Sequence, residues 1–344
     1  MSARTLLVAT VAAWLVAVGC AGGPGAIDSK NLPASPVAIL YREEALALKR
    51  LDAIRDLEKR GKPSDKEGVV VRVETLDAMF GGAPDAQRRL RELNGHLALF
   101  DPQSDEVQVL EGAPPGAKPL AWSLDRTKLL LAGRFRDLVQ LFVWERASGG
   151  FEIVTSGPEE HPMGCLGAGG RLVAVEVRRV AGRYQGRLLA TPPGSATGLR
   201  PATLGPSDVL PTCAPDAPIV AYVTAGDDGV LTIAVLDLDA PGAAPRLVAR
   251  GTDPVFTPDG DWIVYAAIGT QGDRLWRVRP DGSGRTPVGA SKEDEGRPAV
   301  SPDGAYVAYV AKDDQDRERL RVRRFDGSGD GPFLTEGDAD SPVW

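Results

Sequence analysis

The chain has 344 residues, of which 43% are hydrophobic and 25% charged, a balance that supports a large core and excludes wholesale disorder. Its formal net charge of −7 argues against a nucleic-acid-binding protein, because phosphate recognition needs a basic surface. The 40 glycines and 28 prolines recur along the chain, as many short strands joined by tight turns require.

Residues 1–19 predict an export signal. Arg4 supplies a positive start, and the uncharged, mostly apolar run over residues 5–18 is too short to span ~30 Å of hydrocarbon as a helix. The Ala-Val-Gly-Cys sequence that ends at Cys20 resembles a bacterial lipobox. That resemblance implies cleavage before Cys20 and acylation of its thiol; the alternative is an ordinary secretory cleavage with Cys20 incidental.

Two further segments precede the main domain. Residues 20–36 are rich in Gly, Pro, Ala and Ser, which predicts a flexible tether. Residues 37–67 predict an amphipathic helix and a linker, with Gly61 and Pro63 ending the helix. Acidic and basic side chains nearly balance on this helix, so we expect it to pack on the main domain or on a partner and not to lie on a membrane. After the cysteine, Ala-Gly in place of Asp resembles outer-membrane sorting signals of enteric bacteria.

An internal repeat dominates the rest of the chain. PVFTPDGDWIVYAAIGTQGDRLWRVRPDGSG starts at Pro254, and PAVSPDGAYVAYVAKDDQDRERLRVRRFDGSG starts 44 residues later at Pro298. Weaker copies start at Pro119, Pro162 and Pro211. Each copy contains four strand-like pieces, and a four-stranded unit of ~40–45 residues is the signature of a β-propeller blade.

Tight turns separate these pieces. Asp259-Gly260 and Asp303-Gly304 follow the first strand of their copies. Glycine accepts a positive φ there, and the aspartate caps backbone N–H groups two residues on, so we assign these four residues a structural role.

The two ends of the repeat region predict how the ring closes. The last five residues repeat only the first strand of a blade, whereas residues 68–112 supply three strands with no first strand before them. Joining them in one blade removes open sheet edges. The sequence therefore predicts an all-β propeller of six four-stranded blades over residues 68–344.

The Ser/Thr-Pro-Asp-Gly turns and the Ile-Val-Tyr and Val-Ala-Tyr strands that follow them resemble the TolB-like (PD40, WD40-like) propeller repeat of bacterial envelope proteins. The resemblance covers residues 68–344. It implies a periplasmic or surface scaffold that binds proteins. We expect an envelope protein as its partner, no cofactor or metal, and a monomer. TolB itself has a larger N-terminal α/β domain and no lipid, so its own partners are not transferred.

Enzyme functions lack their usual motifs. No Gly-x-Ser-x-Gly nucleophile elbow occurs, and His96 and His161, the two histidines, are too far apart for a helical His-Glu-x-x-His zinc site. We expect both to be structural. The alternatives that stay open are a metal-dependent or lactonase-like hydrolase with carboxylates converging in the channel, and a propeller that binds a small ligand or cation.

Cys165 and Cys213 occupy equivalent first-strand positions in neighbouring copies. Cysteines whose Cα atoms lie more than ~7 Å apart cannot be bridged without strain. Because neighbouring innermost strands fan apart, we expect buried free thiols.

One face of the propeller is predicted to be acidic at the channel mouth. In a propeller, the links that enter each first strand share a face with the loops between second and third strands, opposite the Pro-Asp-Gly turns. Acidic residues outnumber basic ones in those links. We expect this face to receive a basic protein segment or a cation. The candidate residues are Asp208, Asp253, Glu295, Asp338 and Asp340.

Overall fold

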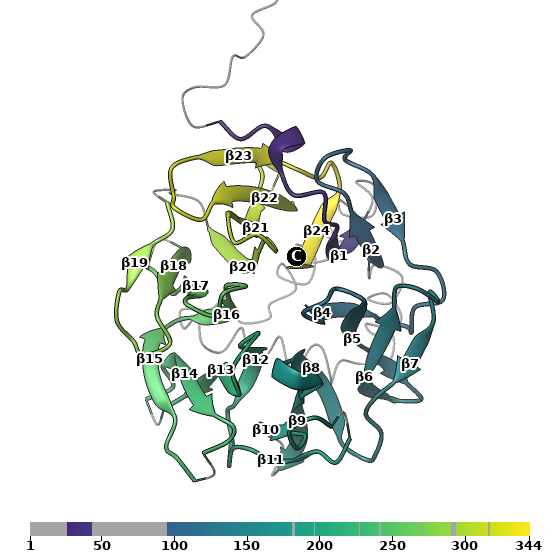
Figure 1. Ribbon diagram of the computed structural model, residues 1–344, viewed down its shortest axis with the longest axis vertical. Coiled ribbons are helices and arrows are strands. Elements are labelled where there is room, and N and C mark those ends of the chain that lie inside the picture. The colour runs from purple at the N-terminus through teal and green to yellow at the C-terminus, as the bar shows by residue number, and fades with distance from the viewer. Residues whose placement is uncertain are drawn as a thin grey trace, which may run out of the picture.

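The computed structural model describes residues 26–42 and 95–344, except residues 181–182, 196, 227, 241, 271, 290–293 and 316. Six four-stranded antiparallel sheets surround a central axis (Figure 1), which confirms the six-bladed propeller. The expected signal and Cys20 lie outside the described residues. Among the described residues, no helix has the length and apolar character that crossing a bilayer requires.

Five blades, II to VI, are each built from one continuous stretch of chain. Blade II contains β4 (Lys118–Trp122), β5 (Lys128–Phe135), β6 (Leu138–Glu145) and β7 (Phe151–Ile153). Blade III contains β8 (Glu160–Leu166), β9 (Leu172–Val180), β10 (Arg183–Ala190) and β11 (Arg200–Pro201), with a 3₁₀ turn η2 (Ala168–Gly170) after β8. Blade IV contains β12 (Val209–Cys213), β13 (Ile219–Ala225), β14 (Leu231–Asp237) and β15 (Arg246–Arg250). Blade V contains β16 (Thr252–Phe256), β17 (Ile263–Ala267), β18 (Arg274–Val278) and β19 (Thr286–Pro287). Blade VI contains β20 (Glu295–Val300), β21 (Tyr306–Lys312), β22 (Glu318–Arg324) and β23 (Asp330–Phe333).

Blade I closes the ring with strands from both ends of the chain. Its order is β24 (Asp338–Val343), β1 (Val37–Arg42), β2 (His96–Phe100) and β3 (Val107–Val109). The C-terminal strand therefore joins the N-terminal blade as expected. Its second strand is β1, whereas the sequence favoured three strands within residues 68–112; of that range, residues 68–94 lie outside the described residues.

The expected helix over residues 37–67 is therefore wrong in its first six residues, and residues 43–67 lie outside the described range. Leu40 pairs with Asp340 on one side of β1 and with Leu97 on the other, so the strand is central in its sheet. A strand covered on both faces reads as a continuous apolar run, here Val-Ala-Ile-Leu, which lacks the alternation that marks a half-exposed strand.

The expected tether over residues 20–36 also needs correction, because residues from Ile27 onward pack on the propeller. Ile27 and Leu32 are 6% and 2% exposed. A 3₁₀ turn, η1 (Ser29–Asn31), separates them. The segment is held by hydrogen bonds as well: Gln103 Nε2 donates to the Leu32 carbonyl at 2.7 Å, and Trp344 Nε1 donates to the Ser35 carbonyl at 2.9 Å.

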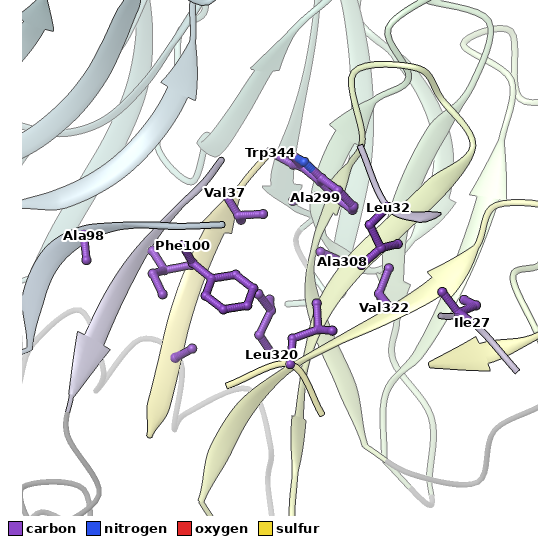
Figure 2. Packing of buried hydrophobic residues seen from close by; sticks show 13 residues of the cluster. Ile27, Leu32, Val37, Ala98, Phe100, Ala299, Ala308, Leu320, Val322 and Trp344 are labelled. Carbon is purple, nitrogen blue, oxygen red and sulfur yellow. The ribbon is translucent and has the colours of Figure 1, made fainter. Parts of the chain in front are cut away.

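The core lies between blades, where the faces of adjacent sheets meet. Figure 2 shows the junction of blades VI and I, where Phe100 and Val37 face Leu320 and Trp344, with Ile27 and Leu32 beside them. Each blade stacks on two neighbours, so its middle strands bury side chains on both faces; all five residues of β17 are buried. Burial of this apolar surface, worth roughly 25 cal/mol per Å², holds the ring together.

The turns after the first strands have the geometry that their residues suggest. Asp259 accepts a hydrogen bond from the Asp261 N–H at 3.0 Å, and Asp303 accepts one from the Ala305 N–H at 3.0 Å. Gly260 and Gly304 both have φ of +72°. These turns lie on one face of the ring, opposite the links that enter the first strands.

Candidate binding site at the channel mouth

The six innermost strands, β24, β4, β8, β12, β16 and β20, line the axis (Figure 1). Each contains a proline beside which the pairing register shifts, so that a bulge recurs in every blade. Proline has no N–H to donate, but the inner side of these strands faces the channel, so no ladder hydrogen bond is lost. Bulges re-aim the neighbouring side chains.

The residue before the proline has a positive φ in four of these strands. The residues are Leu210 (52°), Asp253 (52°), Arg297 (51°) and Ser341 (51°). Such a φ costs a non-glycine residue roughly 1–2 kcal/mol. Backbone strain of this kind clusters at binding sites and switch regions, which directs attention to the side chains beside it.

Charged side chains of alternating sign follow one another around half of this ring. Asp253 comes from blade V, Arg297 from blade VI, Asp340 from blade I and Lys118 from blade II. We call these four residues the charged arc. Arg297 Nη1 lies 2.8 Å from Asp340 Oδ1 and 3.1 Å from Glu318 Oε1, and its side chain remains 38% exposed.

The four charges act on one another. Burial would raise the pKa of Asp340, but Arg297, Lys118 and Arg42 hold that pKa well below its usual range. Burial would lower the pKa of Arg297, whereas Asp340, Glu318 and Asp253 raise it above its ordinary value. Both groups of the central pair are therefore charged at neutral pH.

Two of the five predicted acidic residues have buried arginine partners and must be removed from the candidate face. Glu295 is 2% exposed, and its Oε1 lies 2.7 Å from Arg323 Nη2. Asp338 is 3% exposed, and its Oδ2 lies 3.1 Å from Arg42 Nη1. These carboxylates neutralise arginines that the fold has buried.

The other three residues are distributed unevenly. Asp253 and Asp340 lie on either side of Arg297 in the charged arc. Asp253 also accepts a hydrogen bond from Thr252 Oγ1 at 3.1 Å. Asp208 stands apart in the link before blade IV, where it is 5% exposed and accepts a hydrogen bond from the Gly205 N–H at 3.1 Å.

The histidines do not form a metal site. His161 is 6% exposed, and its Nδ1 lies 3.1 Å from Gln140 Oε1. His96 is exposed at the start of β2. In the part of the chain that the structure describes, no group of three His, Cys, Asp or Glu side chains is placed to hold a metal ion.

Cys165 and Cys213 form a disulfide, so the expectation of free thiols was wrong. Their Cα atoms lie 5.6 Å apart, within the usual range for a bridge. Blades fan apart toward the rim, but β8 and β12 are innermost strands and approach closely near the axis. Gly167 leaves room there, because an added Cβ would lie 3.3 Å from the Cys213 Cβ.

Sequence reasoning missed Lys118 and Arg297 as members of the site, because it sought a surface of one sign. The signal was present: Lys118, Asp253 and Arg297 all directly precede the proline that marks their repeats. Aligning the repeats on that proline places these charges at equivalent positions.

Comparisons with known proteins agree with the fold. No protein-family model matches the chain. It is 32% identical over 131 residues to the uncharacterized protein Atu1656 of Agrobacterium fabrum, an alignment that covers 34% of this chain and 44% of that protein. The chain thus spans less than half the length of this curated relative.

Among solved structures, the putative TolB from Agrobacterium tumefaciens has a TM-score of 0.54 and 22% identity, over 68% of this chain and 86% of that one. TolB from Acinetobacter baumannii has a TM-score of 0.58 and 12% identity, over 90% and 66%. An oligogalacturonate lyase in complex with manganese has a TM-score of 0.50 and 16% identity, over 69% of each chain. The chain therefore has the TolB-like propeller fold, which also serves an enzyme, so the fold alone does not decide activity.

Proposed function

We propose that this chain is an envelope lipoprotein whose propeller binds another protein at the channel mouth and performs no catalytic step. The charged arc carries this proposal. Four ionisable side chains lie on the innermost strands of four successive blades, beside backbone with a positive φ in three of those blades. Placing a site on rigid strands preorganises it for a partner.

The sequence supports the envelope location. The Ala-Val-Gly-Cys sequence ending at Cys20 supplies the proposed lipid attachment site, and the following Ala-Gly supports sorting to an outer membrane, facing the periplasm or the surface. The disulfide between Cys165 and Cys213 is consistent with an oxidising compartment. We propose that the protein is a monomer at this location.

The arrangement of charge suggests what the partner presents. Arg297 and Asp340 satisfy each other at the middle of the charged arc. Lys118 has no hydrogen-bond or ion-pair partner among the described residues, and Asp253 accepts only from its neighbour Thr252 while lying near Arg297. A segment that carries a basic group toward Asp253 and an acidic group toward Lys118 complements both ends. The sequence led us to expect a basic partner segment; the charged arc adds an acidic group to that partner.

Crosslinking pull-down from membranes tests this proposal. The intact chain is compared with the Lys118→Gln/Asp253→Asn double variant and with a Lys128→Gln/Glu152→Gln control, whose two residues are exposed and lie away from the arc. We expect the arc variant to recover about tenfold less of one specific envelope protein, since removing two interface charges costs roughly 1–2 kcal/mol.

Equal recovery by the two variants would exclude the charged arc as the binding site. A Cys20→Ala form, with its N-terminus read by mass spectrometry, tests the anchor separately. If no protein is recovered and a small molecule or metal ion co-purifies, the channel-sited hydrolase or small-ligand alternative takes precedence.

A further inference from the structure

The docked N-terminal segment lies on the face of the Pro-Asp-Gly turns, opposite the channel mouth that carries the arc. Three contacts along residues 31–36 establish this. The Asn31 carbonyl accepts from Tyr306 Oη at 3.5 Å, the Ser35 carbonyl from Trp344, and the Pro36 carbonyl from Arg126 Nη2 at 2.9 Å. Tyr306 begins β21 directly after its turn, Arg126 lies within the turn between β4 and β5, and Trp344 follows β24. All three therefore mark the turn face.

The same segment leaves the propeller at the outer part of blade VI. Ile27 is buried in the cluster that includes Leu320 and Val322 of β22, and Figure 2 shows it beside Val322. An added Cβ on Gly331 of β23, the outermost strand, would lie 3.6 Å from the Ile27 Cβ. The chain toward the N-terminus thus departs from the rim of blade VI.

The connection from this point to the proposed lipid is short. Seven residue steps separate Cys20 from Ile27, which reach at most about 25 Å even when fully extended. The seven residues of β22, which run from the channel-mouth face to the turn face, span roughly 23 Å. This connection, from Cys20 to Ile27, is therefore about as long as one blade is tall.

We propose that the turn face at the rim of blade VI rests against a phospholipid surface and that the channel mouth faces away from it into the aqueous space. This inference rests on the acylation of Cys20 proposed above. The docked segment fixes where the chain leaves the propeller, and the length of residues 20–27 limits how far that point can lie from the bilayer. A partner of the charged arc must then approach from the aqueous side.

The chemistry of this rim fits a zwitterionic headgroup layer. Lys30 is exposed in the docked segment, and Asp326 and Asp330 are exposed in and beside the turn between β22 and β23. Exposed side chains of both signs are compatible with a zwitterionic surface, whereas the two aspartates disfavour a strongly anionic one.

Fluorescence quenching in vesicles tests the orientation. Ser328→Cys and Gln315→Cys place a dye at exposed positions beyond the two ends of β22, on the turn face and the channel-mouth face respectively. The acylated full-length protein is reconstituted into phosphatidylcholine vesicles that contain a lipid with a nitroxide headgroup. We expect at least about twofold quenching at position 328 and little at position 315, because the faces differ by about 20 Å in height.

Three controls separate the possible outcomes. Inserting 12 Gly and Ser residues after Gly25 adds up to about 40 Å of reach, so the difference between the two labels should disappear. The Cys20→Ala form should show no quenching at either position. Equal quenching of both labels in acylated, vesicle-bound protein would overturn the orientation alone, whereas an N-terminus without acyl groups would overturn the lipid anchor together with it.

Discussion

Arg323 and Glu295 form an ion pair inside blade VI, with Nη2 2.7 Å from Oε1 and each side chain 1% exposed. Arg323 also donates to the Val288 carbonyl and lies over the Tyr309 ring. Removing Glu295 would leave the buried Arg323 with only the partly exposed Asp330 as a carboxylate partner, so we expect Glu295→Ala to lower the free energy of unfolding by about 2–3 kcal/mol. Urea titration followed by tryptophan fluorescence measures this change.

A half-exposed ion pair provides the control for this prediction. Glu159 lies 3.5 Å from Arg178, with side chains 34% and 47% exposed, and Glu159→Ala should cost less than about 1 kcal/mol. Similar losses in the two variants would show that the pair in blade VI is not desolvated as described.

The disulfide between Cys165 and Cys213 closes a long loop and should stabilise the propeller. The sequence separation is 48 residues, for which the chain-entropy model predicts up to about 4 kcal/mol. We expect Cys165→Ser/Cys213→Ser to lower Tm and to remove the effect of a reductant on Tm. The measurement is calorimetry with and without a reductant. If the wild-type Tm does not change with reductant and the protein shows two free thiols, the disulfide is contradicted.

His161 should make stability depend on pH below neutrality. Burial lowers its pKa, against smaller opposing effects of Glu176 and Glu159. The unfolded chain therefore takes up the proton first: the contribution of the neutral imidazole is complete above the unfolded pKa of about 6.5 and is lost as pH falls toward the folded pKa.

We accordingly expect the free energy of unfolding to fall between pH 7.5 and 5.5 in the wild type and to change less in His161→Leu. The measurement is urea unfolding at several pH values. His96→Gln is the matched control because His96 is exposed, and it should keep the wild-type slope. An unchanged slope in His161→Leu would assign the dependence to other groups.

Gly251 is the single residue between β15 and β16, and its position admits no side chain. Its φ is +155°, and an added Cβ would lie 2.5 Å from the Ala266 carbonyl oxygen and 2.7 Å from the Tyr265 ring. We expect Gly251→Ala to cost roughly 2 kcal/mol or more in thermal unfolding. Gly296→Ala, whose added Cβ would meet nothing within 4 Å, should cost less than about 1 kcal/mol, and equal losses would refute the crowding.

The fold was predictable because its signals are local and repeated. Asp259-Gly260 and Asp303-Gly304 mark hairpins that can be recognised without knowledge of distant residues. The number of copies of the repeat predicts the number of blades. The strand at Val37–Arg42 was missed because both of its faces are covered, which removes the alternation that identifies strands.

The site was less predictable because it depends on three-dimensional proximity. Glu295 and Asp338 were expected to face a binding partner, but each pairs with a buried arginine instead, Arg323 and Arg42 respectively. Arg42 lies 296 residues from Asp338 in the chain, so the sequence alone does not reveal this pair. The bridge between Cys165 and Cys213 likewise depends on how closely two blades approach at the axis, which no spacing in the sequence encodes.

The composition of blade I has a consequence for how the protein folds. β1 pairs with β24, about 300 residues later in the chain, so the N-terminal strands cannot complete their sheet until nearly all of the chain is available. Contacts of such high order are formed late and slowly. Until then β1 would present an unpaired edge, and the ring would close in a last step that follows folding of the five local blades. We therefore expect a slow phase in refolding. In a chain that lacks β24, adding a peptide that covers this strand should accelerate that phase.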